Sequence, residues 1–199
     1  MKSIIKIVIF TAIVGLAVFI AFNETNLFQI KEEERFTLRK DGEFDCQVIE
    51  KNIGDPHEGG KIAYCNNDGS SGLISTGTDQ SQGVPWGCHG VGVSETKDAY
   101  GSGKDNTEAI LKDCGDRPIA ASVCLSLSRE NFDDWFLPSK EELNYLYSGR
   151  HRIGGFGTTY YWSSSENRFA SAWRQNFNLG TQNTSLKSGS YRVRCVRYF

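Results

Sequence analysis

The sequence predicts an α+β fold in which two short helices flank a twisted antiparallel sheet, with an apolar membrane helix at the N-terminus. Glycine and aromatic residues are abundant: 21 Gly stand against four Pro, with twelve Phe, eight Tyr and four Trp. This composition is typical of aromatic strands joined by tight turns. Helix-start signals occur in the middle of the chain, and part of the C-terminal segment, residues 160–199, alternates with the period of a strand.

Residues 1–22 predict an export segment. Lys2 and Lys6 precede residues 7–22, which carry no charge and would span roughly 24 Å as a helix, against a hydrocarbon core of ~30 Å. Residues 4–22 can cross a membrane if Lys6 extends its amine to the surface. A cleaved signal peptide is the alternative, although no A-x-A cleavage site follows. We therefore expect a membrane-anchored protein with an extracytoplasmic domain, or a secreted one if the segment is cleaved.

The cysteines also favour export. An even number of them is spread through the chain, which suits disulfides in an oxidising compartment. Six cysteines allow 15 pairings, and the residues alone leave the choice open among Cys46, Cys65, Cys88, Cys114, Cys124 and Cys195. Because no C-x-x-C motif or Cys/His cluster has the spacing of a zinc site, we expect no metal and no other cofactor.

The chain divides into the segment 1–22, a polar stalk at 23–43 and a ligand-binding domain at 44–199. Early in the domain, residues 61–65 and 71–75 predict a hairpin around an Asp-Gly turn. A helix is expected from an Asp105 cap to Cys114, and residues 118–127 are helical or extended. Ser139 and Glu142 form the capping box of a further helix that ends at Gly149.

The C-terminal segment predicts three antiparallel strands with turns at Gly180 and Gly189. Alternation places Arg174, Asn176 and Asn178 on one side, opposite a set that shares the other side: Trp173, Gln175, Phe177 and Leu179. The large residues of the segment are expected to be framework, namely Trp162, Trp173, Phe177 and Cys195.

Charge is distributed unevenly, although the net charge is only −2. Residues 150–199 contain eight Lys or Arg residues and a single acidic residue, Glu166, whereas the rest of the chain is acidic. A basic face could bind an anionic partner. Equally, these cations could pair with acids elsewhere in the fold, and the sequence favours neither outcome.

Several spaced motifs resemble one known family: GGKIAY (59–64), GLI (72–74), G-x-G-x-x-N-T (101–107), DWFLPS (134–139) with Glu142-Leu143, YWSSSE (161–166) and VRCVR (193–197). Together, over about residues 52–199, they are similar to the C-terminal domain of the collagen-like adhesin Lcl and to the Fibrobacter-type major paralogous domain. The resemblance implies a C-type-lectin-like fold that serves adhesion or ligand binding. It also implies a disulfide between Cys124 and Cys195, with Cys114–Cys195 as the second choice. The calcium-dependent sugar-binding motifs of animal C-type lectins are absent, so neither calcium nor a sugar specificity is implied.

Residues 167–191 resemble, in addition, the variable region of proteins that are diversified by retroelements. In such regions adenines of Asn codons are randomised, which cannot produce Gln, Glu, Lys, Met or Trp. Between Asn167 and Arg192 only four residues fall in that excluded set, namely Trp173, Gln175, Gln182 and Lys187. Composition alone is no evidence for diversification, so the hypothesis depends on the motifs that flank the segment.

The resulting hypothesis is an exported, surface-displayed ligand-binding or adhesion module rather than an enzyme. Its expected partner is a surface protein or a glycan, an anionic one included, and not a nucleic acid. The contact residues expected from the C-terminal sheet are Arg168, Phe169, Ser171, Arg174, Asn176, Asn178, Thr181, Asn183, Ser185 and Tyr191.

Two alternatives come from other functional classes. One is a structural envelope or assembly protein, whose sheet face packs against further copies of the chain. The other, less favoured, is an enzyme similar to formylglycine-generating oxidases, which need a reactive cysteine pair near the C-terminus. No catalytic residue is expected, because His57, His89 and His151 lie in loops without a nucleophile and an acid at useful spacing.

Overall fold

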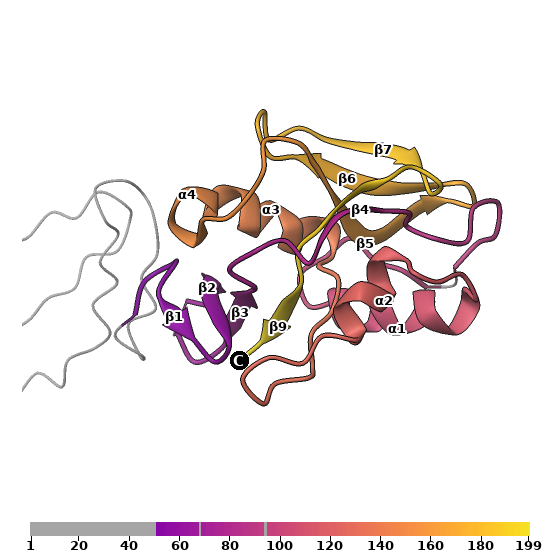
Figure 1. The fold of residues 1–199 in the computed structure, drawn as a ribbon. Helices are drawn as coiled ribbons and strands as arrows, with labels where there is room; N and C mark the ends of the chain where they lie inside the picture. The colour runs from indigo at the N-terminus through magenta and orange to yellow at the C-terminus, as the bar shows by residue number, and fades with distance from the viewer. Residues whose placement is uncertain (1–50, 68, 94) are drawn as a thin grey trace, which may run out of the picture. The chain divides into compact units, whose positions relative to one another are not determined.

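The computed structural model describes residues 51–67, 69–93 and 95–199. The predicted membrane segment (1–22), the stalk (23–43) and Cys46 lie outside these residues. Within the described ranges, no helix has the length and apolar character needed to cross a membrane. The elements in chain order are β1 (Pro56–His57), β2 (Gly60–Cys65), β3 (Gly72–Ser75), β4 (Ser81–Val84), α1 (Gly103–Asp113), α2 (Ala120–Leu125), α3 (Lys140–Ser148), α4 (Arg150–Ile153), β5 (Tyr160–Arg168), β6 (Ser171–Asn176), β7 (Gln182–Leu186), β8 (Tyr191–Val193) and β9 (Val196–Tyr198) (Figure 1).

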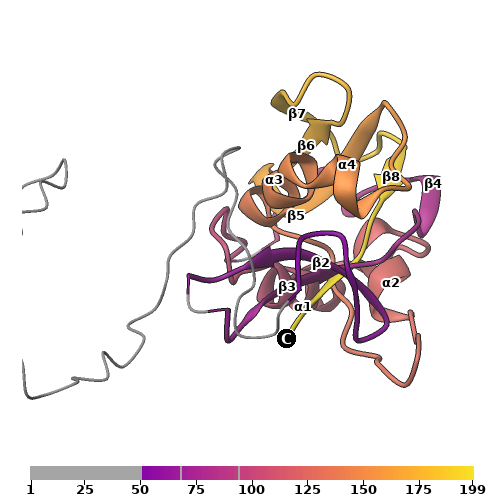
Figure 2. The same ribbon diagram turned by 90° about the vertical axis from the view of Figure 1, so that its left-hand side faces the viewer.

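The strands form two sheets rather than one. The smaller sheet has the order β1-β2-β3-β9, and the larger has the order β4-β8-β5-β6-β7. Helix α3 packs against β5 and β6 of the larger sheet and against β2 of the smaller one. Figure 2 shows this arrangement, with β6 and β7 above α3 and with β2 and β3 below it.

The predicted hairpin is confirmed. Strands β2 and β3 pair antiparallel, and Gly69 in their connection has a φ of 68°, which glycine adopts without steric cost. The C-terminal strand β9 then pairs antiparallel with β3. The predicted run of three antiparallel C-terminal strands is wrong in its last member, which is split into β8 and β9 of different sheets. Strand β8 pairs with β4 and, in parallel, with β5 where Tyr161 is opposite Arg192, and it does not pair with β7.

The capping box of α3 is also confirmed. The hydroxyl of Ser139 accepts a hydrogen bond from the Glu142 amide, and the Glu142 carboxylate accepts one from the Ser139 amide at 2.8 Å. By contrast, Asp105 is not the cap of α1, because the helix begins earlier, at Gly103, and Asp105 lies in its first turn. The buried Glu142 carboxylate accepts the Gly101 N–H at 2.9 Å and so holds this helix start from a distant part of the chain.

Four helices are present among the described residues, where the sequence predicted two. The difference comes from α2, which the sequence left helical or extended, and from the single-turn α4. A mixed helix-and-sheet fold is therefore established, and the finer C-type-lectin-like assignment is not.

The core contains three fully buried tryptophans, Trp86, Trp135 and Trp162. The disulfide Cys124–Cys195 joins α2 to the connection between β8 and β9, as the family resemblance implied. The second choice, Cys114–Cys195, is wrong, because Cys114 pairs with Cys88. Cys65 is disulfide-bonded as well. Both described bridges join segments that are far apart in the sequence, so they fasten helices to the larger sheet and its adjoining loops.

Candidate ligand-binding surface

The larger sheet carries a stack of two tyrosine rings and one guanidinium. The Arg174 guanidinium carbon lies 3.8 Å from the ring centroid of Tyr160 and 4.3 Å from that of Tyr191. Its Nε donates to the Asn183 side-chain oxygen at 2.9 Å. Among the described residues this is the hydrogen bond that the guanidinium makes, and neither of its two terminal amino groups donates to a protein acceptor. The guanidinium is therefore fixed in position while most of its donors stay available.

Strand register explains why these side chains meet. In the antiparallel pairing of β5, β6 and β7, Tyr160 is opposite Asn176, and Arg174 is opposite Asn183. Side chains of directly paired residues project from the same side of a sheet. Tyr191 joins them from β8, and its hydroxyl lies 3.0 Å from that of Ser185. We call this set the central patch, namely Tyr160, Arg174, Asn176, Asn183, Ser185 and Tyr191.

Tyr160 has an unusual electrostatic environment. Hydrogen bonds from the side chains of Asn176 and Asn183 lower the pKa of its phenol below the usual value. The phenolic oxygen therefore lies near two amide donors and beside the Arg174 guanidinium. The patch presents a phenol next to the guanidinium donors of Arg174.

The ten predicted contact residues divide into three groups. Five belong to the central patch: Arg174, Asn176, Asn183, Ser185 and Tyr191. Three lie at the β5–β6 turn (Arg168, Phe169 and Ser171), and two at the β6–β7 turn (Asn178 and Thr181). All ten are half-buried or exposed, but the strand β6 separates the two turns by roughly 16 Å. They therefore form a central area with two outlying edges rather than one evenly shared surface.

The opposite side of β6 is covered by α3. Gln175 is fully buried and donates to the Asn144 side chain at 2.8 Å, and Phe177 is buried among aromatic rings. Trp173 is half-buried beneath Lys140, whose amine lies 3.6 Å from the ring centroid. Leu179 does not follow the predicted alternation and is 68% exposed, because β6 ends at Asn176 and a turn follows. The framework role expected for Trp162, Phe177 and Cys195 agrees with their burial.

Among the described residues, four of the eight cations in residues 150–199 form ion pairs with acids of the same fold. Arg192 and Arg194 both bind the Asp79 carboxylate at 2.7 Å, and the buried Lys187 binds Glu166 at the same distance. Arg197 pairs with Glu58 and Asp134. The excess of positive charge therefore does not gather on the central patch, where Arg174 is the cation.

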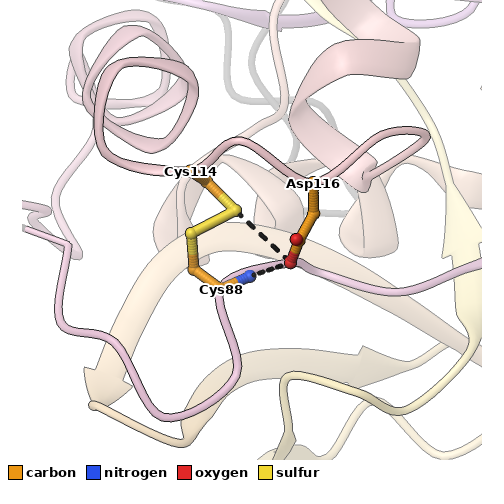
Figure 3. A group of neighbouring side chains, drawn as sticks. All are labelled: Cys88, Cys114 and Asp116. Carbon is orange, nitrogen blue, oxygen red and sulfur yellow. Dashed lines mark hydrogen bonds between the residues drawn. A yellow bond between two sulfur atoms is a disulfide. The ribbon is translucent and has the colours of Figure 1, made fainter.

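One group of side chains has the residue types of a metal site: Cys88, Cys114 and Asp116. Figure 3 shows that the two sulfurs are joined in a disulfide, so neither is a thiolate that could bind a metal ion. The Asp116 carboxylate accepts the Cys88 backbone N–H at 3.0 Å, which gives it a structural role. Cys195 likewise has no thiol, because it is bonded to Cys124.

Tyr160 is a surface residue that was not among the predicted contact residues. Its place depends on the pairing of Tyr160 with Asn176, and β5 contains irregular register that no local pattern reveals. Strand alternation could have indicated its exposure, because it puts Tyr160 and the buried Tyr161 on opposite sides of the strand.

The fold and this surface define a disulfide-linked domain that displays polar and aromatic side chains on a sheet. The sequence profile described as the Lcl C-terminal domain matches residues 75–197, more than half of the chain. The protein therefore belongs to the Lcl C-terminal domain family.

Other comparisons add little. No curated protein matches the chain. A crystal structure of a fimbrial protein from Bacteroides ovatus ATCC 8483 aligns with 63% of this chain at 16% identity and a TM-score of 0.46. The aligned part spans 35% of that longer chain. A likeness at this level carries no conclusion about function.

Proposed function

We propose that this protein is an exported, surface-displayed ligand-binding or adhesion module that contacts its partner through the central patch. Family membership supports the general class, and the stack of Tyr160, Arg174 and Tyr191 is the observation that carries the assignment. Tyrosine and arginine dominate the binding energy of many protein surfaces, because they supply area and hydrogen bonds at a low entropic cost. Here the rings and the guanidinium already hold one another in position.

The chemistry of the patch suggests an oxygen-rich partner, either a surface protein or a glycan. Both the Tyr160 hydroxyl and the Arg174 amino groups are donors, so they suit carbonyl, hydroxyl or anionic oxygens. Since Arg174 is the cation of the patch, a single anionic group could bind there. Broad attraction of a polyanion is weakened because, in the described part of the chain, four of the eight C-terminal cations are already paired with acids.

Diversification by a retroelement is the finer part of this proposal. The four residues that adenine randomisation cannot produce all avoid the central patch. Trp173, Gln175 and Gln182 lie on the α3 side of the sheet, and Lys187 is fully buried. Every central-patch residue between Asn167 and Arg192 is one that randomised Asn codons can encode. A reverse transcriptase gene beside a near-copy of codons 160–199 would support diversification, and its absence would count against it.

We propose further that residues 4–22 anchor the domain at a membrane, and that the domain has a C-type-lectin-like fold. The disulfide from α2 to the C-terminal strands supports the fold assignment. The exported location is supported by the disulfides, which persist in oxidising compartments.

An array printed with purified extracellular proteins and with neutral and anionic glycans tests the central patch, using the purified full chain as the probe. For the proteins and anionic glycans that the array retains, Arg174→Ala should weaken binding about thirtyfold, which corresponds to about 2 kcal/mol, the scale of a hot-spot residue.

Arg150→Ala is the matched control. Arg150 is also stacked on a tyrosine, Tyr147, at 3.9 Å, but it belongs to α4 rather than to the sheet. Its loss removes the same charge and the same type of contact and should leave binding unchanged. Equal binding by the two variants would show that the central patch is not the contact surface.

A further inference from the structure

A cleft lies at the start of α3, on the side of the larger sheet opposite the central patch. It has a volume of about 380 Å³, within the range of small-molecule sites. The loop before α1, the first turns of α3 and the strand β7 contribute its lining, which consists of Asp98, Ala99, Lys140, Glu141, Asn144 and Gln182. None of these residues belongs to the central patch, so the cleft is a separate candidate site.

The walls of the cleft are fixed by hydrogen bonds between its three segments. The Glu141 amide donates to the Asp98 carbonyl at 3.0 Å, and the Gln182 side-chain nitrogen donates to the Lys140 carbonyl at 2.8 Å. The Glu141 carboxylate accepts the Tyr100 N–H at 2.8 Å. The cleft is therefore preformed, and a ligand would not have to order it.

These same bonds determine which polar atoms remain for a ligand. The Asn144 oxygen accepts from Gln175, so the Asn144 nitrogen is left to donate. The Gln182 nitrogen is used by Lys140, so the Gln182 oxygen is left to accept. The carboxylates of Asp98 and Glu141 add further acceptor capacity. Acceptors thus exceed donors in the cleft.

Charge narrows the class of ligand. Two carboxylates, Asp98 and Glu141, face the cleft against one ammonium, that of Lys140. This ammonium is already engaged, since it lies 3.2 Å from Asp98 and 3.6 Å from the Trp173 ring centroid. An anionic ligand would meet net repulsion, so the cleft suits an uncharged molecule better than an anionic one.

We propose that this cleft binds a neutral sugar, such as a hexose unit of a glycan. Each sugar hydroxyl both donates and accepts, so neighbouring hydroxyls can donate to the carboxylates and to Gln182 while one accepts from Asn144. A peptide backbone offers one N–H and one carbonyl per residue. Because the cleft has few free donors, the carbonyls of a bound peptide would be left without hydrogen bonds. The exposed Ala99 provides a small apolar wall for the C–H face of the ring.

Saturation-transfer difference NMR of the purified full chain tests the proposal with glucose, galactose, mannose, glucuronate and N-acetyl-triglycine amide. At least one neutral hexose should bind saturably, and glucuronate should bind less well. Ala99→Phe fills the cleft from an exposed position and should abolish the signal. Asn144→Asp keeps the acceptor for Gln175 but removes the free donor, and it should weaken binding about tenfold.

Thermal unfolding of both variants should match that of the parent chain, and Arg150→Ala should leave the hexose signal unchanged. The proposal is overturned if no hexose binds, if hexose binding survives in Ala99→Phe, or if glucuronate or the peptide binds in preference. Because none of these measurements involves Arg174, they can fail while the central patch stands, and the reverse is equally possible.

Discussion

Tyr160 and Tyr161 are consecutive residues of β5, yet their side chains lie in opposite surroundings. Tyr160 is half-buried in the central patch, where side-chain amides lower the pKa of its phenol. Tyr161 is fully buried on the α3 side, where desolvation raises its pKa to about 12 although the Gly157 N–H opposes the shift. The Tyr161 hydroxyl donates to the Asp79 carboxylate at 2.8 Å. The two sides of one strand therefore use the same residue type for display and for support.

Arginine is divided in the same way. Arg194 is fully buried, and its guanidinium binds Asp79 and the carbonyls of Thr76 and Gly154. Among the described residues, Arg174 donates to one acceptor, the Asn183 side-chain oxygen, and stacks on rings at the surface. The difference teaches that residue type alone does not identify a binding side chain. What distinguishes the two arginines is how many of their donors the fold already uses.

The largest expected effect on the free energy of unfolding comes from removing the Asp79 carboxylate, which binds side chains on the buried side of β5. Asp79→Ala would leave the buried Arg194 charge unpaired and would also take an acceptor from Arg192 and Tyr161. We expect the free energy of unfolding to fall by about 5 kcal/mol, the upper end for breaking one partner of a buried ion pair. Urea unfolding followed by tryptophan fluorescence measures this change.

Asp98→Ala is the control for that prediction, since the Asp98 side chain is 51% exposed and pairs with Lys140 at 3.2 Å. Exposed pairs of this kind contribute between zero and about 1 kcal/mol. If the two aspartate variants had equal stability, the supporting role assigned to the buried Asp79 carboxylate would be wrong.

A second prediction compares two phenylalanines of the C-terminal segment. Phe177 is buried, with its ring centroid 4.4 Å from that of Tyr161 and 4.6 Å from that of Phe156. Phe177→Ala should reduce the free energy of unfolding by about 3 to 4 kcal/mol, because the lost contacts leave a cavity. Phe169 is 71% exposed, and Phe169→Ala should change the free energy of unfolding by no more than about 0.5 kcal/mol. Thermal and urea unfolding of both variants would detect a reversal of this order.

Local sequence signals predicted the elements that are determined by neighbouring residues. The hairpin of β2 and β3, the Ser139 capping box and the alternation of Arg174 with Gln175 depend on turn chemistry, capping and the strand period. These effects act over a few residues, so a sequence pattern is enough. The Cys124–Cys195 bridge came from the family resemblance, because spacing alone left every pairing open.

The parts that could not be predicted depend on contacts between distant residues. Lys187 can be fully buried because the Glu166 carboxylate and the Val91 carbonyl both accept from its amine. Helix α1 begins before Asp105, where the distant Glu142 carboxylate accepts the Gly101 N–H. Tyr160 enters the central patch only through its register with Asn176. Within the candidate site, the predicted residues of β6, β7 and β8 came together, while those of the two turns lie at its edges.

The smallest expected effect is a difference in pKa between Tyr160 and Tyr161. It is also the most direct measure of how the two sides of β5 differ. In a titration followed by NMR of tyrosine labelled with ¹³C at Cζ, Tyr160 should ionise below the usual pKa of 10.0 and Tyr161 near 12. Because the folded state holds the Tyr161 proton more tightly than the unfolded chain does, this phenol stabilises the fold below pH 10. That contribution is lost as the pH rises from 10 to about 12, and Tyr161→Phe should remove this part of the alkaline loss. Asn183→Leu should raise the pKa of Tyr160 toward 10.0 without moving that of Tyr161. A common pKa for both phenols would mean that the two sides of β5 do not differ in solution as they do in the structure.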